Sequence, residues 1–395
     1  FNFQTMICDL TGLDVSNASL LDEGTAAAEA MFMCNSFNKN KNSNSFLVAN
    51  DCFPQTIAVI KTRAKARGIN VVVDDPLNFK FENAFGCLLQ YPNVDGNISD
   101  YSSIITKAHQ NNVLVVIAAD ILALTILKSC GELQADIAVG SVQRFGIPLF
   151  YGGPHAGYIA ARQDLIRFIP GRIVGLSKDK RGNSGYRLAL QTREQHIRRE
   201  KATSNICTAQ ALLANMSVMY AIYHGPQGLK NIALKINSLA QILSKALSII
   251  GFQNLNKYYF DTLKIYIPSK DAENIVNKAY SKNINFRLID DDHIGISLDE
   301  TTTLEDIKSI LEVFGDYTNL LDTIDVTQIN LSIPNSLQRT SQYLTHPVFN
   351  KYHSETELMR YIKKLEYKDL SLTLSMIPLG SCTMKLNAAA ELLPV

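Results

Sequence analysis

Two observations predict an α/β fold, with a large domain built on a parallel sheet and a smaller α+β domain after it. In the first 225 residues, short runs of Val, Ile and Leu alternate with helical segments. Near-continuous apolar strands of this kind indicate a parallel sheet covered by helices on both faces. After residue 225 the pattern changes, because residues 262–267 alternate polar and apolar side chains, which is typical of a half-exposed strand.

The large domain is predicted to contain six strands separated by helices. The predicted strands are 44–50, 69–75, 84–92, 113–120, 135–141 and 156–162. The predicted helices are 17–37, 54–68, 101–112 and 121–134. Asn17 or Ser19 is expected to cap the first helix, because Asn and Ser side chains accept bonds from free backbone N–H groups. Gly68 is expected to close the second helix.

The remaining elements are shorter. After a long amphipathic helix that ends at Gly251, the predicted elements are strand 258–268, helix 271–283, strands 284–290 and 293–300, helix 303–315 and helix 354–372. Thr303 is expected to cap one of these helices, and Ser354 with Glu357 to form the capping box of another. The predicted divisions are therefore a large domain 1–225, a small domain 226–318, a linker 319–350 and a further unit 351–395.

Composition excludes several classes of protein. The formal net charge is +1, so no basic surface for nucleic acid is indicated. No apolar run approaches the ~20 residues that cross a bilayer, and the first residues do not form a signal peptide. The seven cysteines lack metal-site spacing, which favours reduced intracellular thiols and no metal. The chain lacks a starting Met, and we expect it to be a fragment.

The order of a large and a small α/β domain is typical of pyridoxal-phosphate enzymes of the aspartate-aminotransferase type, fold type I. This is an analogy of fold and does not define a function. In such a site, a lysine binds the coenzyme, an acid faces the ring nitrogen, and a helix N-terminus binds the phosphate. Each requirement can be compared with the sequence.

All three features of the coenzyme site depart from that pattern. The strand end "GSVQRFG" has Gln143 and Arg144 where the lysine is expected, and neither forms a Schiff base. Asp22 and Glu23 stand where the phosphate would bind, and they favour the helix dipole themselves. Asp120 lies past the register of a ring acid, so a helix cap is the preferred interpretation. Together the three departures indicate a domain that kept the architecture and lost the coenzyme.

Three other polar segments leave alternatives open. A basic stretch is either a solvated helix face or an interface with a partner; it comprises Arg193, His196, Arg198, Arg199 and Lys201. His155, in "GGPHAG", is interpreted first as a turn residue and second as part of an active-site rim. The string "GSCT", residues 380–383, forms a tight turn before a helix, and such a turn is usually a cap.

Long strings along the whole chain resemble one family, the glycine decarboxylase P-protein of the glycine cleavage system. The resemblance runs from residue 1 to residue 395 and is carried by "FNFQTM", "DLTGLD", "QRFG", "YGGPHAGY", "QTREQHIRREKATSNICT", "YAIYHGP", "YFDTL", "HPVFNKYHSETELMRY" and "IPLGSCTMKLNAAAE". That family has two related halves, on one chain or on two subunits. Its second half holds the coenzyme lysine in a His-Lys-Thr-Phe string, which places Gln143 at the lysine position.

The resemblance implies a PLP-dependent oxidoreductase, glycine dehydrogenase (decarboxylating). Glycine is decarboxylated through a pyridoxal-phosphate aldimine, and the aminomethyl group passes to the lipoyl arm of the H-protein. This chain corresponds to the half without the lysine, a linker and the start of the catalytic half, and we expect it to be inactive alone. The alternative is a non-catalytic scaffold or regulatory subunit; the gene sequence beyond Val395 would discriminate the two. An aminotransferase would need a competent lysine and ring acid.

Further expectations also come only from this resemblance. Ser381, Cys382 and Thr383 are the candidates for contact with the coenzyme, which the missing half binds. The expected partners are glycine, the lipoylated H-protein, the T- and L-proteins and the other half of the P-protein, in a dimer. No nucleic acid or membrane partner is expected. The compartment would be the cytoplasm in a bacterium or the mitochondrial matrix in a eukaryote.

Overall fold

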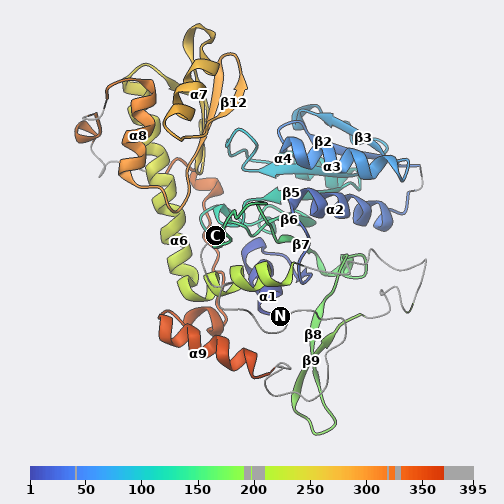
Figure 1. Ribbon diagram of the computed structural model, residues 1–395. Coiled ribbons are helices and arrows are strands. Elements are labelled where there is room, and N and C mark those ends of the chain that lie inside the picture. The colour runs from blue at the N-terminus through green and yellow to red at the C-terminus, as the bar shows by residue number, and fades with distance from the viewer. Residues whose placement is uncertain (41, 191–196, 198–209, 318–319, 325–330, 369–395) are drawn as a thin grey trace.

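The fold contains a seven-stranded sheet, a four-stranded sheet, a projecting hairpin and a long kinked helix that connects these parts (Figure 1). It was obtained as a computed structural model. The structure describes residues 1–40, 42–190, 197, 210–317, 320–324 and 331–368.

The large sheet has the strand order β1-β7-β6-β5-β4-β2-β3. Its strands are β1 (Val15–Ser16), β2 (Ser45–Ala49), β3 (Asn70–Asp74), β4 (Ala84–Tyr91), β5 (Leu114–Ala119), β6 (Ile137–Ser141) and β7 (Gly157–Ala161). The six predicted strands are confirmed, but the expected parallel sheet is mixed. Strand β7 runs antiparallel to β6, the strand before it in the chain, and the edge strand β1 is antiparallel to β7 and so has the same direction as β6. The two residues of β1 are too few to give a sequence pattern.

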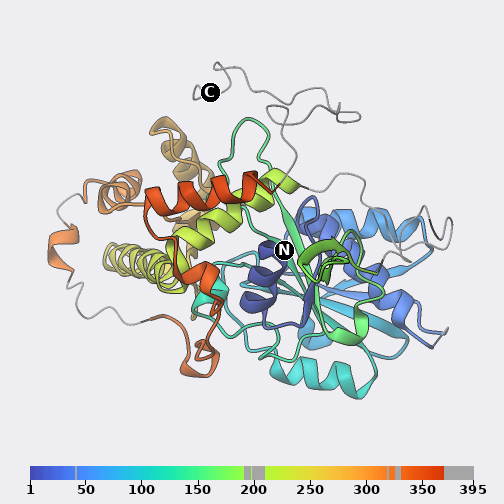
Figure 2. The same cartoon turned by 90° about the horizontal axis from the view of Figure 1, so that it is seen from below.

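Helices cover both faces of this sheet. They are α1 (Asn2–Thr11), α2 (Glu23–Phe37), α3 (Pro54–Lys65) and α4 (Ser102–Gln110). Helices α2 and α3 cover one face and α4 the other (Figure 2). The strands between them are fully buried along β4 and β5, as their continuous apolar sequence predicts.

The predicted caps of the first large helix were wrong. Helix α2 begins at Glu23, and its cap is Asp22, whose side chain accepts a bond from the Thr25 backbone N–H at 2.7 Å. Asn17 and Ser19 lie upstream in a buried segment, where Leu20 forms an isolated bridge with Gly157 of β7. That pairing with a distant strand keeps the chain extended until Asp22.

The predicted helix 121–134 is also wrong, because its backbone bonds to a distant part of the chain. Only a 3-10 turn, η2 (Ala123–Thr125), forms there. The Leu124 carbonyl accepts a bond from the Arg339 guanidinium at 2.8 Å, and the Lys128 N–H donates to the Leu337 carbonyl at 2.8 Å. These bonds occupy the groups that a continuing α-helix would need.

The small sheet is antiparallel, with the order β10-β11-β13-β12. Its strands are β10 (Gln253–Asn254), β11 (Thr262–Tyr266), β12 (Arg287–Asp290) and β13 (His293–Ser297), and its helices are α7 (Ala272–Ser281) and α8 (Leu304–Phe314). Except for β10, these elements were predicted. The predicted cap is confirmed as well, because Thr303 forms a capping box with Asp306 at the start of α8.

Helix α6 (Ala211–Ile249) is longer than the sequence predicted. It kinks at Gly225, which has φ 63° and ψ 179° and is followed by Pro226. The part after the kink is the predicted helix, whereas residues 211–224 were not predicted to be helical. Their side chains are apolar on nearly every face, so no amphipathic pattern marks them.

Three features complete the described chain. The hairpin of β8 (Val174–Lys178) and β9 (Ser184–Leu188) was missed, and it projects from the body in Figure 1. Helix α9 (Glu355–Glu366) begins at the predicted cap Ser354. The expected linker is irregular but packs on the core through buried side chains; they include Ile333, Leu337, Leu344 and Phe349. The divisions between domains stay predictions.

Candidate functional site

Charged side chains gather where the carboxyl ends of β5 and β6 face the small sheet. Asp120 follows β5 and Arg144 lies three residues beyond β6, while Asp261 directly precedes β11 of the small sheet. Ligands of open α/β sheets bind at this carboxyl edge. A coenzyme bound to this large sheet would therefore contact the residues at its carboxyl edge.

Arg144 forms an ion triad with two carboxylates. Its Nη1 atom lies 2.8 Å from Asp120 Oδ2 and also bonds to Asp261 Oδ2. The side chains of Arg144, Asp120 and Asp261 are 22%, 20% and 10% exposed. The guanidinium also lies over the Phe260 ring, 5.4 Å from its centroid. This ion triad links the large sheet to the small one.

The electrostatics of the ion triad follow from its burial. Burial opposes the charge on Arg144, but the carboxylates of Asp120 and Asp261 outweigh that effect and raise the guanidinium pKa. Burial raises the pKa of Asp261, and the attraction of Arg144 limits this rise. Asp120 caps the following turn, because Oδ1 accepts bonds from the backbone N–H groups of Leu122 at 2.8 Å and Ala123 at 3.1 Å. The preferred interpretation of Asp120 as a cap agrees with this geometry.

The start of α2 holds the second departure from a coenzyme site. The Asp22 carboxylate accepts the Thr25 N–H bond itself, and Glu23 accepts a bond from the Thr56 hydroxyl at 3.0 Å. Burial raises the pKa of Glu23 to about 7, and the charges of Asp120 and Asp22 act in the same direction. Two carboxyl groups therefore lie at the helix N-terminus where a phosphate dianion would need free N–H groups.

The third departure is Gln143, which the surrounding loop fixes. Its side-chain amide donates to the Ile147 carbonyl at 2.8 Å, and its backbone N–H donates to the Ser141 hydroxyl at 3.1 Å. That hydroxyl is also 2.8 Å from Nδ1 of His155. His155 thus joins the two ends of the loop between β6 and β7, in agreement with its first interpretation as a turn residue.

These residues do not fit pyridoxal phosphate. A carboxyl pair stands at the N-terminus of α2, an arginine ion triad lies at the carboxyl edge of the sheet, and the residue at the predicted lysine position, Gln143, is an amide. A phosphate dianion at this helix end would be repelled by the Asp22 carboxylate. The carboxyl edge of this sheet is therefore built as a closed ionic contact.

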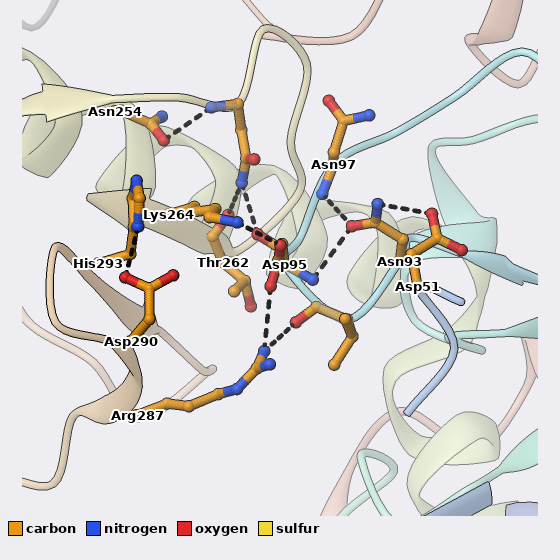
Figure 3. Close-up of polar contacts among 12 residues, drawn as sticks. Asp51, Asn93, Asp95, Asn97, Asn254, Thr262, Lys264, Arg287, Asp290 and His293 are labelled. Carbon is orange, nitrogen blue, oxygen red and sulfur yellow. Dashed lines mark hydrogen bonds and ion pairs between the residues drawn. The ribbon is translucent and has the colours of Figure 1, made fainter. Parts of the chain in front are cut away.

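A second polar contact joins the turn after β4 to the small sheet, and Figure 3 shows it. Asp95 accepts a bond from Lys264 Nζ at 2.7 Å, and the Val94 carbonyl accepts one from Arg287 at 2.6 Å. The Asn256 side chain donates to the Asp95 carbonyl at 2.6 Å. Lys264 and Arg287 lie on β11 and β12, so this contact fixes the small sheet at a second point.

The Asp95 turn is shaped to approach the small sheet closely. Asn93 orders it, because Oδ1 of Asn93 accepts the N–H groups of Asp95 at 3.1 Å and Asn97 at 2.8 Å. Gly96 has φ +87°, and a Cβ there would lie 2.6 Å from Thr262 Cβ and closer still to the Thr262 carbonyl oxygen. Only glycine allows this contact without movement of the turn.

Several predicted residues lie outside the part that the structure describes. They are Ser381, Cys382 and Thr383, and the basic residues Arg193, His196, Arg198, Arg199 and Lys201. Within the described residues, no cluster of His, Cys, Asp or Glu could hold a metal, and five cysteines are free thiols. No helix among those residues is both long and apolar enough to cross a membrane.

The sequence interpretation missed the partners from the small domain. Asp261 lies in the string "YFDTL", which carried the resemblance, but nothing in the sequence paired it with Arg144 across 117 residues. Asp95 and Lys264 are 169 residues apart and are equally invisible to local patterns. A charged residue, Asp261, inside the predicted strand 258–268 was the one available signal.

The sheet order and the position of this edge are those of the fold class of fold type I pyridoxal-phosphate enzymes. A solved structure of a putative O-acetylhomoserine (thiol)-lyase from Campylobacter jejuni, with a pyridoxyl-lysine, has this fold. It gives a TM-score of 0.56 at 13% identity, covering 79% of this chain and 84% of that one. A likeness at this identity concerns the fold alone.

The chain belongs to the glycine cleavage system P-protein family, because the sequence model of that family matches residues 1–314. The glycine dehydrogenase (decarboxylating) of Nostoc punctiforme is 56% identical over 402 aligned residues, covering 100% of this chain and 41% of that protein. A crystal structure of glycine decarboxylase (P-protein) in inhibitor-bound form gives a TM-score of 0.75 at 32% identity. It covers 80% of this chain and 74% of that one. The chain thus spans about 41% of its curated relatives but most of that solved chain.

Proposed function

We propose that this chain is the half of a glycine dehydrogenase (decarboxylating) that lacks the coenzyme lysine. In the whole protein, glycine loses carbon dioxide and its aminomethyl group passes to the oxidised lipoyl arm of the H-protein, whose disulfide is reduced. The coenzyme would be bound by the other half. The ion triad of Arg144, Asp120 and Asp261 carries this proposal, because it closes the edge at which a coenzyme would bind.

The roles we assign to this half are structural. It would complete the cavity of the lysine-bearing half and help to receive the H-protein, with the T- and L-proteins as the other members of the system. Ser381, Cys382 and Thr383 remain our candidates for coenzyme contact, and the basic residues from Arg193 to Lys201 for a partner contact. We infer a bacterial cytoplasm or a mitochondrial matrix as the compartment.

Both a fused and a separate arrangement of the halves are consistent with the relatives. The curated proteins are more than twice as long as this chain, whereas the solved P-protein chain is only slightly longer. The second arrangement supports a half that folds as its own polypeptide. A scaffold without any catalytic partner is the remaining alternative.

The proposal is tested by reduction of the coenzyme onto the protein. The 395-residue chain is incubated with a small excess of pyridoxal phosphate, treated with borohydride and digested for mass spectrometry. We expect only scattered, substoichiometric labelling of surface lysines and no glycine decarboxylation. A stoichiometric adduct at one lysine, protected by glycine, would refute the proposed role.

A variant that introduces a lysine at position 143 provides a second test. Gln143→Lys supplies an amine at the position of the coenzyme lysine but leaves the ion triad and the two carboxyl groups of α2 in place. We expect no coenzyme absorbance and no adduct at position 143. Stable binding by this single variant would show that the edge accepts the coenzyme, contrary to the fit described above.

A further inference from the structure

A cavity of about 520 Å³, the amino-edge cavity, lies at the edge of the large sheet opposite the ion triad. It is lined by the ends of α2 and α4 and by the starts of β4 and β5. Arg162 reaches the same edge, because β7 runs antiparallel to β6 and ends there. Pockets of this size bind small molecules when a few polar groups converge on an apolar lining. The amino-edge cavity is therefore a candidate binding site, separate from the carboxyl edge.

A buried carboxylate organises the charged wall of this cavity. Asp136, directly before β6, has a side chain that is only 1% exposed. Its Oδ2 atom accepts a bond from the Val115 N–H at 2.6 Å and lies 3.0 Å from Nε2 of His109. Its Oδ1 atom lies 2.9 Å from Nη1 of Arg162. Asp136 is thus paired on both oxygens, and these charge-assisted contacts hold His109 and Arg162 in place.

The cavity presents the positive partners of Asp136 and not the acid itself. The His109 and Arg162 side chains are 33% and 42% exposed. Lys39 also lines the cavity, is exposed, and forms no ion pair with the described residues. Asp136 is the one carboxylate in the described lining, because Asp164, which bonds to Nη2 of Arg162 at 3.2 Å, lies outside it. An anion in the cavity would therefore face positive side chains and no open carboxylate.

The helix end beside the cavity does not offset this positive charge. Unpaired carbonyls at a helix C-terminus favour a cation over an anion. At the end of α4, however, the Ala108 carbonyl accepts a bond from the Val113 N–H at 2.9 Å, and the His109 carbonyl accepts one from the Asn112 N–H at 3.0 Å. These carbonyls are used within the chain, so the side chains decide which charge the cavity prefers.

The rest of the lining is partly apolar. Phe37, Phe85 and Leu114 contribute apolar surface to the same cavity. A fully hydrated ion such as inorganic phosphate would cover only the charged wall and would leave this apolar surface open to water. A ligand that matches both parts has one acidic group on an apolar body.

We propose that the amino-edge cavity binds a small organic anion, with one carboxylate or phosphate group on a flat apolar body. The acidic group would lie between Lys39, His109 and Arg162, and the apolar body against Phe37 and Phe85. The two acid types share the negative charge that this wall recognises. The proposal goes beyond the proposed function and does not depend on it, because the cavity lies at the other edge of the sheet from the ion triad.

A ligand-observed NMR titration of the 395-residue chain tests the charge and the shape of the ligand together. The three probes are benzoate, phenyl phosphate and the uncharged benzamide. We expect benzoate or phenyl phosphate to bind saturably, with a dissociation constant on the order of 1 mM, and at least ten-fold more tightly than benzamide. The tighter of the two acids identifies the acidic group. Benzamide binding as tight as that of the acids, or no saturable binding of either acid, would overturn the proposal.

Two variants locate the bound probe in the amino-edge cavity. Lys39→Met removes an exposed charge and leaves the Asp136 contacts intact, and Ser43→Trp fills the cavity from its wall. Lys61→Met, at an exposed lysine of α3, is the matched control.

We expect Lys39→Met to weaken binding of the tighter acid at least five-fold, Ser43→Trp to abolish it, and Lys61→Met to leave it unchanged. Melting curves followed by circular dichroism show that each variant is folded; Lys39→Met alone decides the outcome if Ser43→Trp does not fold. Unchanged binding in a folded cavity variant would place the anion elsewhere and overturn the proposal. The readout does not involve glycine turnover, so failure of the proposed function would leave this result unaffected.

Discussion

Replacing Arg144 by methionine is expected to destabilise the chain more than any surface charge change. The variant removes the cation but leaves the carboxylates of Asp120 and Asp261, which are 20% and 10% exposed. Removing one partner of a buried ion pair costs about 3–5 kcal/mol, because the remaining charge has no compensation. Partial exposure places the expected loss near the lower end, at about 3 kcal/mol.

The loss of stability caused by Arg144→Met is expected to depend on pH. Arg144 attracts the Asp261 carboxylate, so its removal raises the Asp261 pKa further above the usual value. A raised pKa means that the folded state binds a proton more tightly than the unfolded state, and stability falls as pH rises through that range. The destabilisation by Arg144→Met is therefore expected to be smaller at pH 4.5 than at pH 7.

The assay is urea unfolding followed by circular dichroism, at both pH values. Lys282→Met is the matched control, because Lys282 and Glu312 form a pair that is 41% and 39% exposed; such pairs contribute less than about 1 kcal/mol. Arg144→Met combined with Asp120→Asn and Asp261→Asn should recover most of the loss, since no uncompensated charge remains. A loss for Arg144→Met no larger than that of the control would refute the reasoning.

Three further predictions concern other contacts. Gly96→Ala is expected to lower the free energy of unfolding in urea by about 2–3 kcal/mol, because it adds overpacking at Thr262 to the left-handed strain. The control Gly182→Ala, at φ +84° with open space around it, should lower it by only about 1 kcal/mol, and equal losses would contradict the close approach of Gly96 to Thr262. Because the pKa of Glu23 is raised to about 7, this group should lower the free energy of unfolding by about 3 kcal/mol as the pH rises from 4.5 to 7. Glu23→Gln should remove this pH dependence in urea unfolding, and an unchanged pH dependence would mean that other groups cause it. Arg339→Met should lower the free energy of unfolding by about 2–3 kcal/mol, because the guanidinium donates bonds to the carbonyls of Leu10, Leu124 and Asp9. Thermal unfolding measures this loss, and a loss below about 1 kcal/mol would mean that water replaces these bonds.

Local signals were sufficient for many elements. The capping sequences at Thr303 and Ser354 marked the starts of α8 and α9, because a cap bonds to N–H groups within three residues. The apolar runs of β4 and β5 marked buried strands. That Gln143 stands at the position of the coenzyme lysine stays a prediction, because only the fold analogy and the family resemblance place it there. The start of α2 was misplaced, since the bridge between Leu20 and Gly157 overrides the local caps.

The sequence by itself determined the residue type at each position and the periodicity of each segment, and these define the α/β class. Only the tertiary structure decided which charges meet. Arg144 and Asp261 are separated by 117 residues, and Lys264 and Asp95 by 169. The segment 121–134 lost its helix to backbone bonds with residues 337–339 for the same reason. Bonds between distant segments depend on how the whole chain packs, and no local pattern encodes them.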